Sequence, residues 1–408
     1  APPGLRWCVA GRNRSKLEAL GAPAVVVCDA DHAADVDALA RRARVIVGFA
    51  GPFVQYSDAL VAACVRHGTH WIDICGEVAW HRSLLDRFGD RARATHALVV
   101  NHCGFDSLPS DLGALFAVNA LRSRAADPAL RVATVMNYQV GLGGISGGSL
   151  ATGMAMTSHP VVLSAGVDVD SPFLLGGEPS CGARKEDGPE TEAWFDDALQ
   201  CWVGPFQMAD INLKVVRRSN ALLGYGPDLS VREVGVCFTE KQARKAAKQA
   251  VTPTPPAIIA KMIEAGRLPK PGEGPPPSLR AVSRFQATVI ATAEMVGGAE
   301  APLPEDVCVT VSGGECGYEE TSKMAIEAGL ALIYESATCP GIVAGGGFFT
   351  PAAAMGTTLI NRLDRAGIRF EVLPGRAAPA AKQSIQAFVA RAEAVKRAGQ
   401  QKPGKAKL

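Results

Sequence analysis

The stretch from Val45 to Glu77 reads VIVGFAGPFVQYSDALVAACVRHGTHWIDICGE, and it decides the expected fold. It opens with the apolar run Val45–Phe49, continues through Asp58–His67 with helical spacing, and reaches a second apolar run at Trp71–Ile74. Gly68 follows the helical segment, as is typical of a helix C-terminus. A strand, a helix and a strand in this order predict two parallel strands joined by a crossover helix.

The same alternation extends on both sides of this unit. Apolar runs at residues 5–10, 24–28 and 98–100 are separated by polar segments with helical spacing. Continuous apolar strands between helices are typical of a parallel sheet that is covered on both faces. We therefore expect an α/β fold in which residues 1–110 form a Rossmann-type, doubly wound parallel sheet that binds a dinucleotide.

The alternation of short apolar strands with helical segments ends at about Asp111. Residues 131–140 predict a long strand, and residues 281–291 and 307–312 alternate like antiparallel strands. Three further regions are expected: a second α+β domain with an antiparallel sheet, for substrate binding or dimerisation, at 111–318; helices that return to the first domain at 319–374; and a basic helical tail at 375–408.

Composition narrows the function classes. Of 408 residues, 42 are Lys or Arg and 40 are Asp or Glu, and this near balance argues against a nucleic-acid binder. No apolar run approaches the length of a transmembrane helix. The eleven cysteines include no C-x-x-C pair, which indicates reduced thiols and no metal site. A cytoplasmic location is expected, with an organellar or membrane-peripheral one left open.

A basic turn directly follows the first apolar run. It contains Arg12, Asn13, Arg14 and Lys16, and the next acid along the chain is Glu18. At the end of the second strand of a Rossmann sheet, an acid binds the ribose hydroxyl of NAD, whereas Arg accommodates the 2′-phosphate of NADP. The turn favours NADP, with NAD as the second choice, unless it is an ordinary basic turn.

Small residues and acids follow three of the other predicted strands. Gly51 and Pro52 follow one strand, Glu77 follows the next, and Asp106 follows the third. Ligands of open α/β sheets bind outside the carboxyl ends of the strands, so Glu77 and Asp106 could face one pocket with Gly51. Glu77, Asp106 and Asp111 are the candidate catalytic acids, and a helix-capping or loop role is the alternative for Glu77 and Asp106.

Five segments together resemble the saccharopine dehydrogenase-like oxidoreductases, whose subgroups include the trans-acting enoyl reductases of lipid synthesis. They are AGRNRSKL, GPFVQYSDALVAACVRHGTHWIDICGE, CGFDSLPSDLG, VVRRSNALLGYG and GGFFTPAAAMG, and the resemblance covers nearly all of residues 5–373. It implies a Rossmann domain that binds NAD(P) and a second α+β domain. It also implies that Arg12 contacts the cofactor phosphate, that Gly51 and Pro52 lie near the nicotinamide, and that the cleft is lined by Glu77, Cys103, Gly104 and Asp106.

The resemblance departs from the family at the start of the sequence. Family members begin with a strand and a G-x-x-G-x-x-G-type turn before the strand that ends in AGR. Here that strand comes first, at residues 5–10. We therefore expect the sequence to be a fragment of a longer chain, because the earlier strand would supply the backbone amides that hold the cofactor pyrophosphate.

The function expected from these features is hydride transfer. An NAD(P)-dependent oxidoreductase would act on an apolar or lipid-linked small molecule, such as one that carries an enoyl group. The alternative is a non-catalytic scaffold or membrane-surface protein that contacts lipid through the basic tail. A homodimer is expected as one form of assembly.

Overall fold

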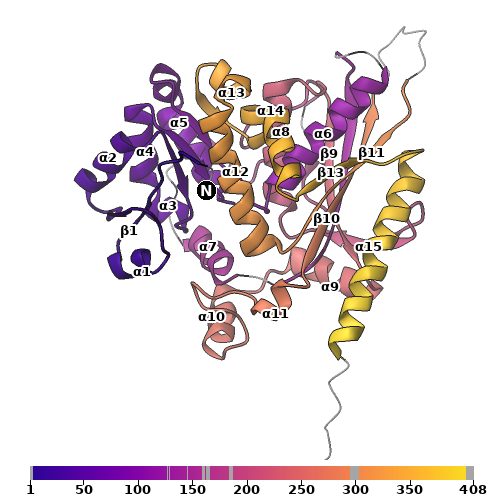
Figure 1. Ribbon diagram of the computed structural model, residues 1–408. Helices are drawn as coiled ribbons and strands as arrows, with labels where there is room; N and C mark the ends of the chain where they lie inside the picture. Colours follow the sequence, from indigo (N-terminus) through magenta and orange to yellow (C-terminus); the bar gives the residue numbers. More distant parts are fainter. Residues whose placement is uncertain are drawn as a thin grey trace, which may run out of the picture.

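The computed structural model describes residues 3–125, 127, 129–144, 146–158, 161, 166–182, 187–294 and 303–400. Figure 1 shows the N-terminal region on one side and a larger sheet on the other, with the helices α12 and α14 between them. The chain therefore has two sheet-based regions, as expected, and the final region of the chain contributes to both.

The first region contains parallel strands only. β3 (Val45–Gly48), β4 (His70–Asp73), β5 (Leu98–Val100) and β12 (Gly347–Phe349) form a sheet in the order β12-β5-β4-β3. β1 (Val9–Gly11) and β2 (Val25–Val27) form a separate parallel pair. Among the strands of the described residues, β3 pairs with β4 alone. Its side chains are only half-buried, whereas those of β5 are fully buried.

Helices cover both faces of this sheet. Alternate residues of a strand point to opposite faces, so Trp71 and Val99 pack with α2 (Ala33–Arg42), α4 (Asp58–His67) and α5 (Val78–Ala94). Ile72 packs on the other side, where α12 (Thr321–Tyr334) crosses β3 and β4. Gly329 permits this crossing, because a Cβ there would lie 2.9 Å from a methyl group of Val47.

The second region is a mixed sheet of seven strands in the order β13-β11-β10-β6-β9-β8-β7. Its neighbouring strands are antiparallel except for the parallel pair β6–β9. The strands are β6 (Val132–Leu142), β7 (Trp194–Asp196), β8 (Cys201–Pro205), β9 (Ser230–Cys237), β10 (Arg284–Ala293), β11 (Val307–Gly313) and β13 (Arg369–Val372). The expected fold class, a Rossmann-type parallel sheet plus a second α+β domain, is confirmed.

Each face of the mixed sheet has its own helices. α6 (Leu108–Ala125) and α8 (Ala209–Leu223) cover one face, and α15 (Ala377–Gln400) covers the other. The helix predicted within residues 375–408 thus packs on the sheet through Ile385 and Phe388, which are buried. Residues 401–408, including three of the basic residues of the predicted tail, lie outside the described residues.

The remaining helices range from short turns to the buried α14 between the two regions. They are α1 (Arg14–Glu18), α3 (Phe53–Tyr56), α7 (Gly147–Ser158), α9 (Glu240–Val251), α10 (Pro256–Glu264), α11 (Pro277–Arg280), α13 (Pro340–Val343) and α14 (Pro351–Arg365), with the π-helical turn η2 (Cys316–Glu320) and the 3-10 turn η3 (Ser336–Thr338). Across the described residues, no helix combines the length and the apolar character that crossing a bilayer requires.

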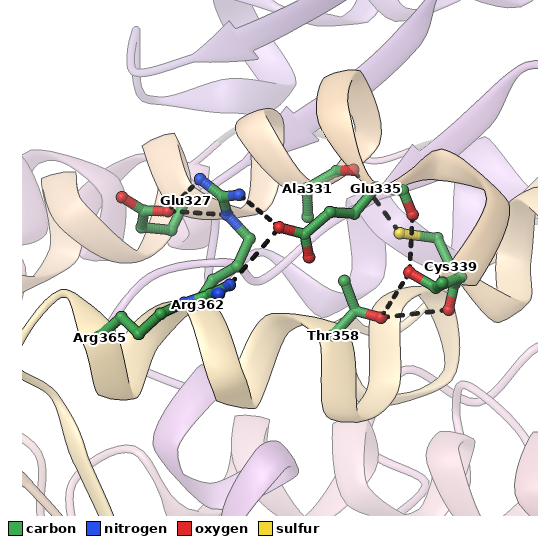
Figure 2. A network of polar contacts seen from close by, with 8 residues as sticks. Glu327, Ala331, Glu335, Cys339, Thr358, Arg362 and Arg365 are labelled. Carbon is green, nitrogen blue, oxygen red and sulfur yellow. Dashed lines mark hydrogen bonds and ion pairs between the residues drawn. The ribbon is translucent and has the colours of Figure 1, made fainter. Parts of the chain in front are cut away.

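A polar network joins α12 to α14 between the two regions. Figure 2 shows the Arg362 guanidinium between two carboxylates: Nε donates to Glu327 Oε2 at 2.8 Å, and Nη1 donates to Glu335 Oε1 at 2.8 Å. The Arg362 side chain is only 13% exposed. Thr358 Oγ1 adds a hydrogen bond of 3.2 Å to the carbonyl of Thr338. This pairing of α12 and α14 fixes the two regions to each other.

Replacing the central cation of this network should lower stability. We expect Arg362→Ala to reduce the free energy of unfolding by about 1–3 kcal/mol, because two partly buried carboxylates lose their common donor. The matched control is Arg369→Ala, which removes an ion pair whose arginine is 60% exposed and should cost less than about 1 kcal/mol. Equal effects of the two variants in urea unfolding would contradict the assignment.

Candidate functional site

The carboxylate of Glu77 holds the turn that follows β3. Its Oε1 accepts the backbone N–H of Phe53 and its Oε2 accepts that of Val54, each at 2.7 Å. These two N–H groups belong to the first turn of α3, where a helix has no internal acceptors. Glu77 lies just beyond β4 and is buried. Its carboxylate is therefore committed to the backbone in this structure, which favours a structural role over an acid role.

Two other predicted site residues meet at the same short helix. Gly51 and Pro52 lead directly into α3. The guanidinium of Arg12 lies over the ring of Tyr56, 5.5 Å from its centre. The structure thus gathers Arg12, Gly51, Pro52 and Glu77 around α3, although they come from three separate turns of the chain.

The basic turn forms a pocket of its own. Its lining consists of Arg12, Asn13, Arg14, Ser15, Lys16 and Glu18. Asn13 Oδ1 accepts the backbone N–H of Lys16 at 3.0 Å and so caps α1. Arg14 pairs with Glu18 at 3.4 Å, which neutralises the pocket's acid. Arg12 and Lys16 leave a net positive surface beside the end of β1.

Asp106 lies at the carboxyl end of β5, next to the turn after β4. Its Oδ2 is 3.9 Å from the position that a Cβ on Gly76 would occupy, and the same position is 3.2 Å from Ile211 Cδ1 of α8. The side chain is half-buried, and burial raises the pKa of Asp106 to about 6. It makes no hydrogen bond to any residue that the structure describes. Asp106 is thus a carboxyl group that can be protonated near neutral pH.

The second region closes around this edge of the sheet. Met208 and Ile211, at the start of α8, approach Gly76, and Thr152 Oγ1 of α7 is 3.3 Å from the Cβ position of Gly51. The Phe105 ring packs edge-on against Phe285 of β10, with 4.8 Å between ring centres. The surroundings of Asp106 and Gly51 are therefore largely apolar and come from both regions.

Cys103 and Gly104 lie in the buried loop that follows β5, just before Asp106. The Cys103 thiol is fully buried, and burial raises its pKa well above the usual value. A Cβ on Gly104 would come within 3.0 Å of Ile74 and 3.2 Å of Thr321. Glycine thus allows the loop after β5 to pass between Ile74 and the start of α12. Neither Cys103 nor Gly104 presents a polar side-chain atom to a ligand here.

Asp111 occupies a different place from the other two acids. It is buried on α6, where Oδ2 accepts the backbone N–H of Ala352 at 2.8 Å and Oδ1 accepts the hydroxyl of Ser219. Burial raises the pKa of Asp111 to about 7, against the effect of these hydrogen bonds. Oδ2 thus holds the first turn of α14 and Oδ1 holds a side chain of α8, so the contacts favour a structural role.

A buried polar network under the same edge was missed from the sequence. Asp73, at the end of β4, accepts hydrogen bonds from Trp71 Nε1 at 2.7 Å and from Asn101 Nδ2 at 2.6 Å. Its other oxygen accepts the backbone N–H groups of Cys75 and His102. This single carboxylate therefore fixes the turns after β4 and β5 together. The available signal was an acid inside an otherwise apolar strand.

Two buried histidines continue the network. His102 Nδ1 lies 2.7 Å from the carbonyl oxygen of Cys75 and must donate to it, so its Nε2 accepts from His81 Nδ1 at 2.9 Å. Burial lowers the pKa of both rings, most strongly that of His81. Twenty-one residues separate the two histidines along the chain, and no sequence motif connects them.

A parallel sheet whose carboxyl edge meets a second, mixed sheet defines a two-domain Rossmann-type α/β protein. No family model matches the chain. It is 30% identical over 406 residues to the protein named "Putative trans-acting enoyl reductase" of Mycobacterium tuberculosis, with 90% of each chain covered. It is also 30% identical over 398 residues to the trans-acting enoyl reductase of Mycobacterium ulcerans, covering 89% of this chain and 90% of the relative. The chain therefore belongs to the trans-acting enoyl reductase family, a family of oxidoreductases.

A solved structure is also similar. The apo histidine-tagged saccharopine dehydrogenase (L-Glu forming) from Saccharomyces cerevisiae superposes with a TM-score of 0.47 at 10% identity, covering 91% of this chain and 95% of that chain.

The role of Glu77 can be tested through stability. We expect Glu77→Gln to lower the free energy of unfolding by about 1–3 kcal/mol, because the amide offers one acceptor where α3 presents two donors. Urea unfolding measures the change, and Glu192→Gln, at an exposed position, is the matched control. A variant that loses activity with unchanged stability would instead identify Glu77 as a catalytic acid.

Proposed function

We propose that the chain is an NAD(P)-dependent oxidoreductase that prefers NADP and reduces a polarised double bond, such as an enoyl group, in an apolar or lipid-linked substrate. Membership of the trans-acting enoyl reductase family supports the reaction class. The observation that carries the mechanism is Asp106, an acid without a protein partner among the described residues, at the edge of the sheet where ligands of this fold bind.

The cofactor preference rests on the basic pocket. Arg12 and Lys16 would bind the 2′-phosphate of NADP, because an arginine makes strong charge-assisted hydrogen bonds to a phosphate. The pocket's one acid, Glu18, already pairs with Arg14. The residues present therefore fit the adenosine end of NADP, which carries a negatively charged 2′-phosphate. Gly51 and Pro52, which directly precede α3, would then lie toward the nicotinamide.

The chemistry needs a hydride and a proton. When bound, a reduced nicotinamide would supply a hydride to one carbon of the double bond, and the other carbon would take up a proton. Asp106 would supply this proton from its carboxylic acid and become a carboxylate, which solvent reprotonates. Its pKa of about 6 leaves half of the groups protonated near pH 6 and about a tenth at pH 7.

An apolar substrate fits the surroundings of this acid. Met208 and Ile211 of α8 approach the Gly76 turn beside Asp106, and Phe105 is half-buried next to Asp106 in the chain. Apolar walls favour an acyl chain and exclude water from the reacting carbons. Orientation of the two reactants would then supply much of the rate.

The Asp106 proposal predicts a specific pH profile. We expect Asp106→Asn to lower kcat by about 10²–10⁴-fold, because the amide cannot donate the proton. In the parent protein, the rate should fall as the pH rises through about 6, since only the protonated acid is active. NADPH oxidation with a short enoyl thioester measures both effects.

The control for this variant is Asp197→Asn, at an exposed position. An Asp106→Asn protein with the parent rate and pH profile would remove Asp106 from the mechanism.

The cofactor assignment predicts a difference between NADPH and NADH. We expect Arg12→Ala to weaken NADPH binding by roughly 10–100-fold, because a hydrogen-bonded charge pair contributes about 1.5–3 kcal/mol. NADH binding should change little, since NADH has no 2′-phosphate. Equilibrium titration of the full-length protein measures both affinities, with Arg41→Ala as the control. Equal losses for both nucleotides would contradict the assignment, and binding of neither by the parent would favour a non-catalytic family member.

A further inference from the structure

Helix α10 carries apolar side chains that no other element buries fully: Ile258 is exposed, and Ile259, Met262 and Ile263 are half-buried. Ile258, Ile259, Met262 and Ile263 follow one another at helical spacing, and no residue of α10 is buried. Ile258 is 45% exposed. The helix makes only marginal contacts with the other helices and strands of the described chain. A nine-residue helix is barely stable in water without a surface to pack on, so this partly exposed apolar side is a candidate docking face.

The residues around this helix are strongly basic. Between residues 241 and 270 the chain carries one acid, Glu264, and seven basic residues: Lys241, Arg244, Lys245, Lys248, Lys261, Arg267 and Lys270. All seven are exposed, and Arg244 pairs with Glu240 of the same helix. The whole chain has a net charge of +2, so this segment concentrates positive charge that the rest of the molecule balances.

The turn that directly follows this segment is fastened beside the proposed active site. The backbone N–H of Gly147 donates to the carbonyl of Glu273 at 2.9 Å, and the Tyr318 hydroxyl donates to the same carbonyl at 2.8 Å. Gly147 begins α7, whose Thr152 borders Gly51. Figure 1 shows α7, α10 and α11 together along the lower edge of the molecule. The surface of α10 thus lies on the same side as the α7 wall.

We propose that residues 241–270, which we name the basic arm, dock the protein on an anionic lipid bilayer. An interfacial helix buries its apolar face at the level of the headgroups, while basic residues around it bind anionic lipids. The positive charge favours this partner over a second copy of the chain, which would bring the same charge against it. Docking would present the α7 side of the molecule to lipid-linked substrates. This inference concerns a surface that the proposed reaction does not use.

Vesicle co-sedimentation of the full-length protein tests the proposal without cofactor or turnover. We expect binding to vesicles of phosphatidylcholine and phosphatidylglycerol in equal parts, and much weaker binding to phosphatidylcholine alone. Ile258→Ser and Lys248→Glu should each weaken binding by roughly tenfold, through lost apolar burial and lost charge attraction respectively. Because α10 has no buried residue, the Ile258 variant should unfold at the parent's urea midpoint.

Matched controls lie on other helices. Ile326→Ser replaces an equally exposed isoleucine of α12, and Arg91→Glu reverses an exposed charge on α5. Both should bind vesicles like the parent.

Four outcomes would overturn the proposal. They are no binding to anionic vesicles, equal binding to neutral ones, no effect of the two arm variants, or loss of binding in a chain that ends at residue 400, which would place the contact in the basic tail. Light scattering that shows a dimer dispersed by Ile258→Ser would identify a second copy as the occupant instead. Because none of these readouts involves NADPH, their failure is separate from a failure of the proposed reaction.

Discussion

The arrangement of the candidate site depends on one buried carboxylate and two backbone amides. Glu77 reaches from the turn after β4 to the first turn of α3, which follows β3, and both of its oxygens accept a hydrogen bond there. Unpaired amides at a buried helix start would be costly, so this contact fixes the distance between the two turns. Gly51, Pro52 and the Tyr56 ring that Arg12 covers all take their positions from α3.

Three acids that look alike in the sequence have different environments. Glu77 and Asp111 accept backbone hydrogen bonds in the interior, whereas Asp106 is half-buried in apolar surroundings, and burial raises its pKa to about 6. The surroundings of a carboxyl group, rather than its identity, decide whether it holds structure or moves a proton. Of the three, the contacts leave Asp106 available for a proton transfer.

The sequence predicted the elements whose pattern is local. The strand at 131–140 and the antiparallel pair at 281–291 and 307–312 were found, because period-two alternation is visible within each segment. β12 and β13 were missed, although the predicted strands β1–β5 are equally short, because neither is a continuous apolar run: β12 begins in a run of three glycines and β13 contains two charged residues in four. The sequence predicted the site at the carboxyl edge of the sheet, but the hydrogen bonds of Glu77 depend on how separate turns meet, which no local pattern records.

The chain changes regions several times near its end. After β11 in the mixed sheet it adds α12 and β12 to the parallel sheet, and it then returns to the mixed sheet as β13. Each sheet thus contains or packs on segments whose neighbours along the chain belong to the other. Neither can lose its structure while the other keeps a complete set of strands and covering helices. Denaturation should accordingly be a single cooperative event, although proteins of this size commonly unfold one domain at a time.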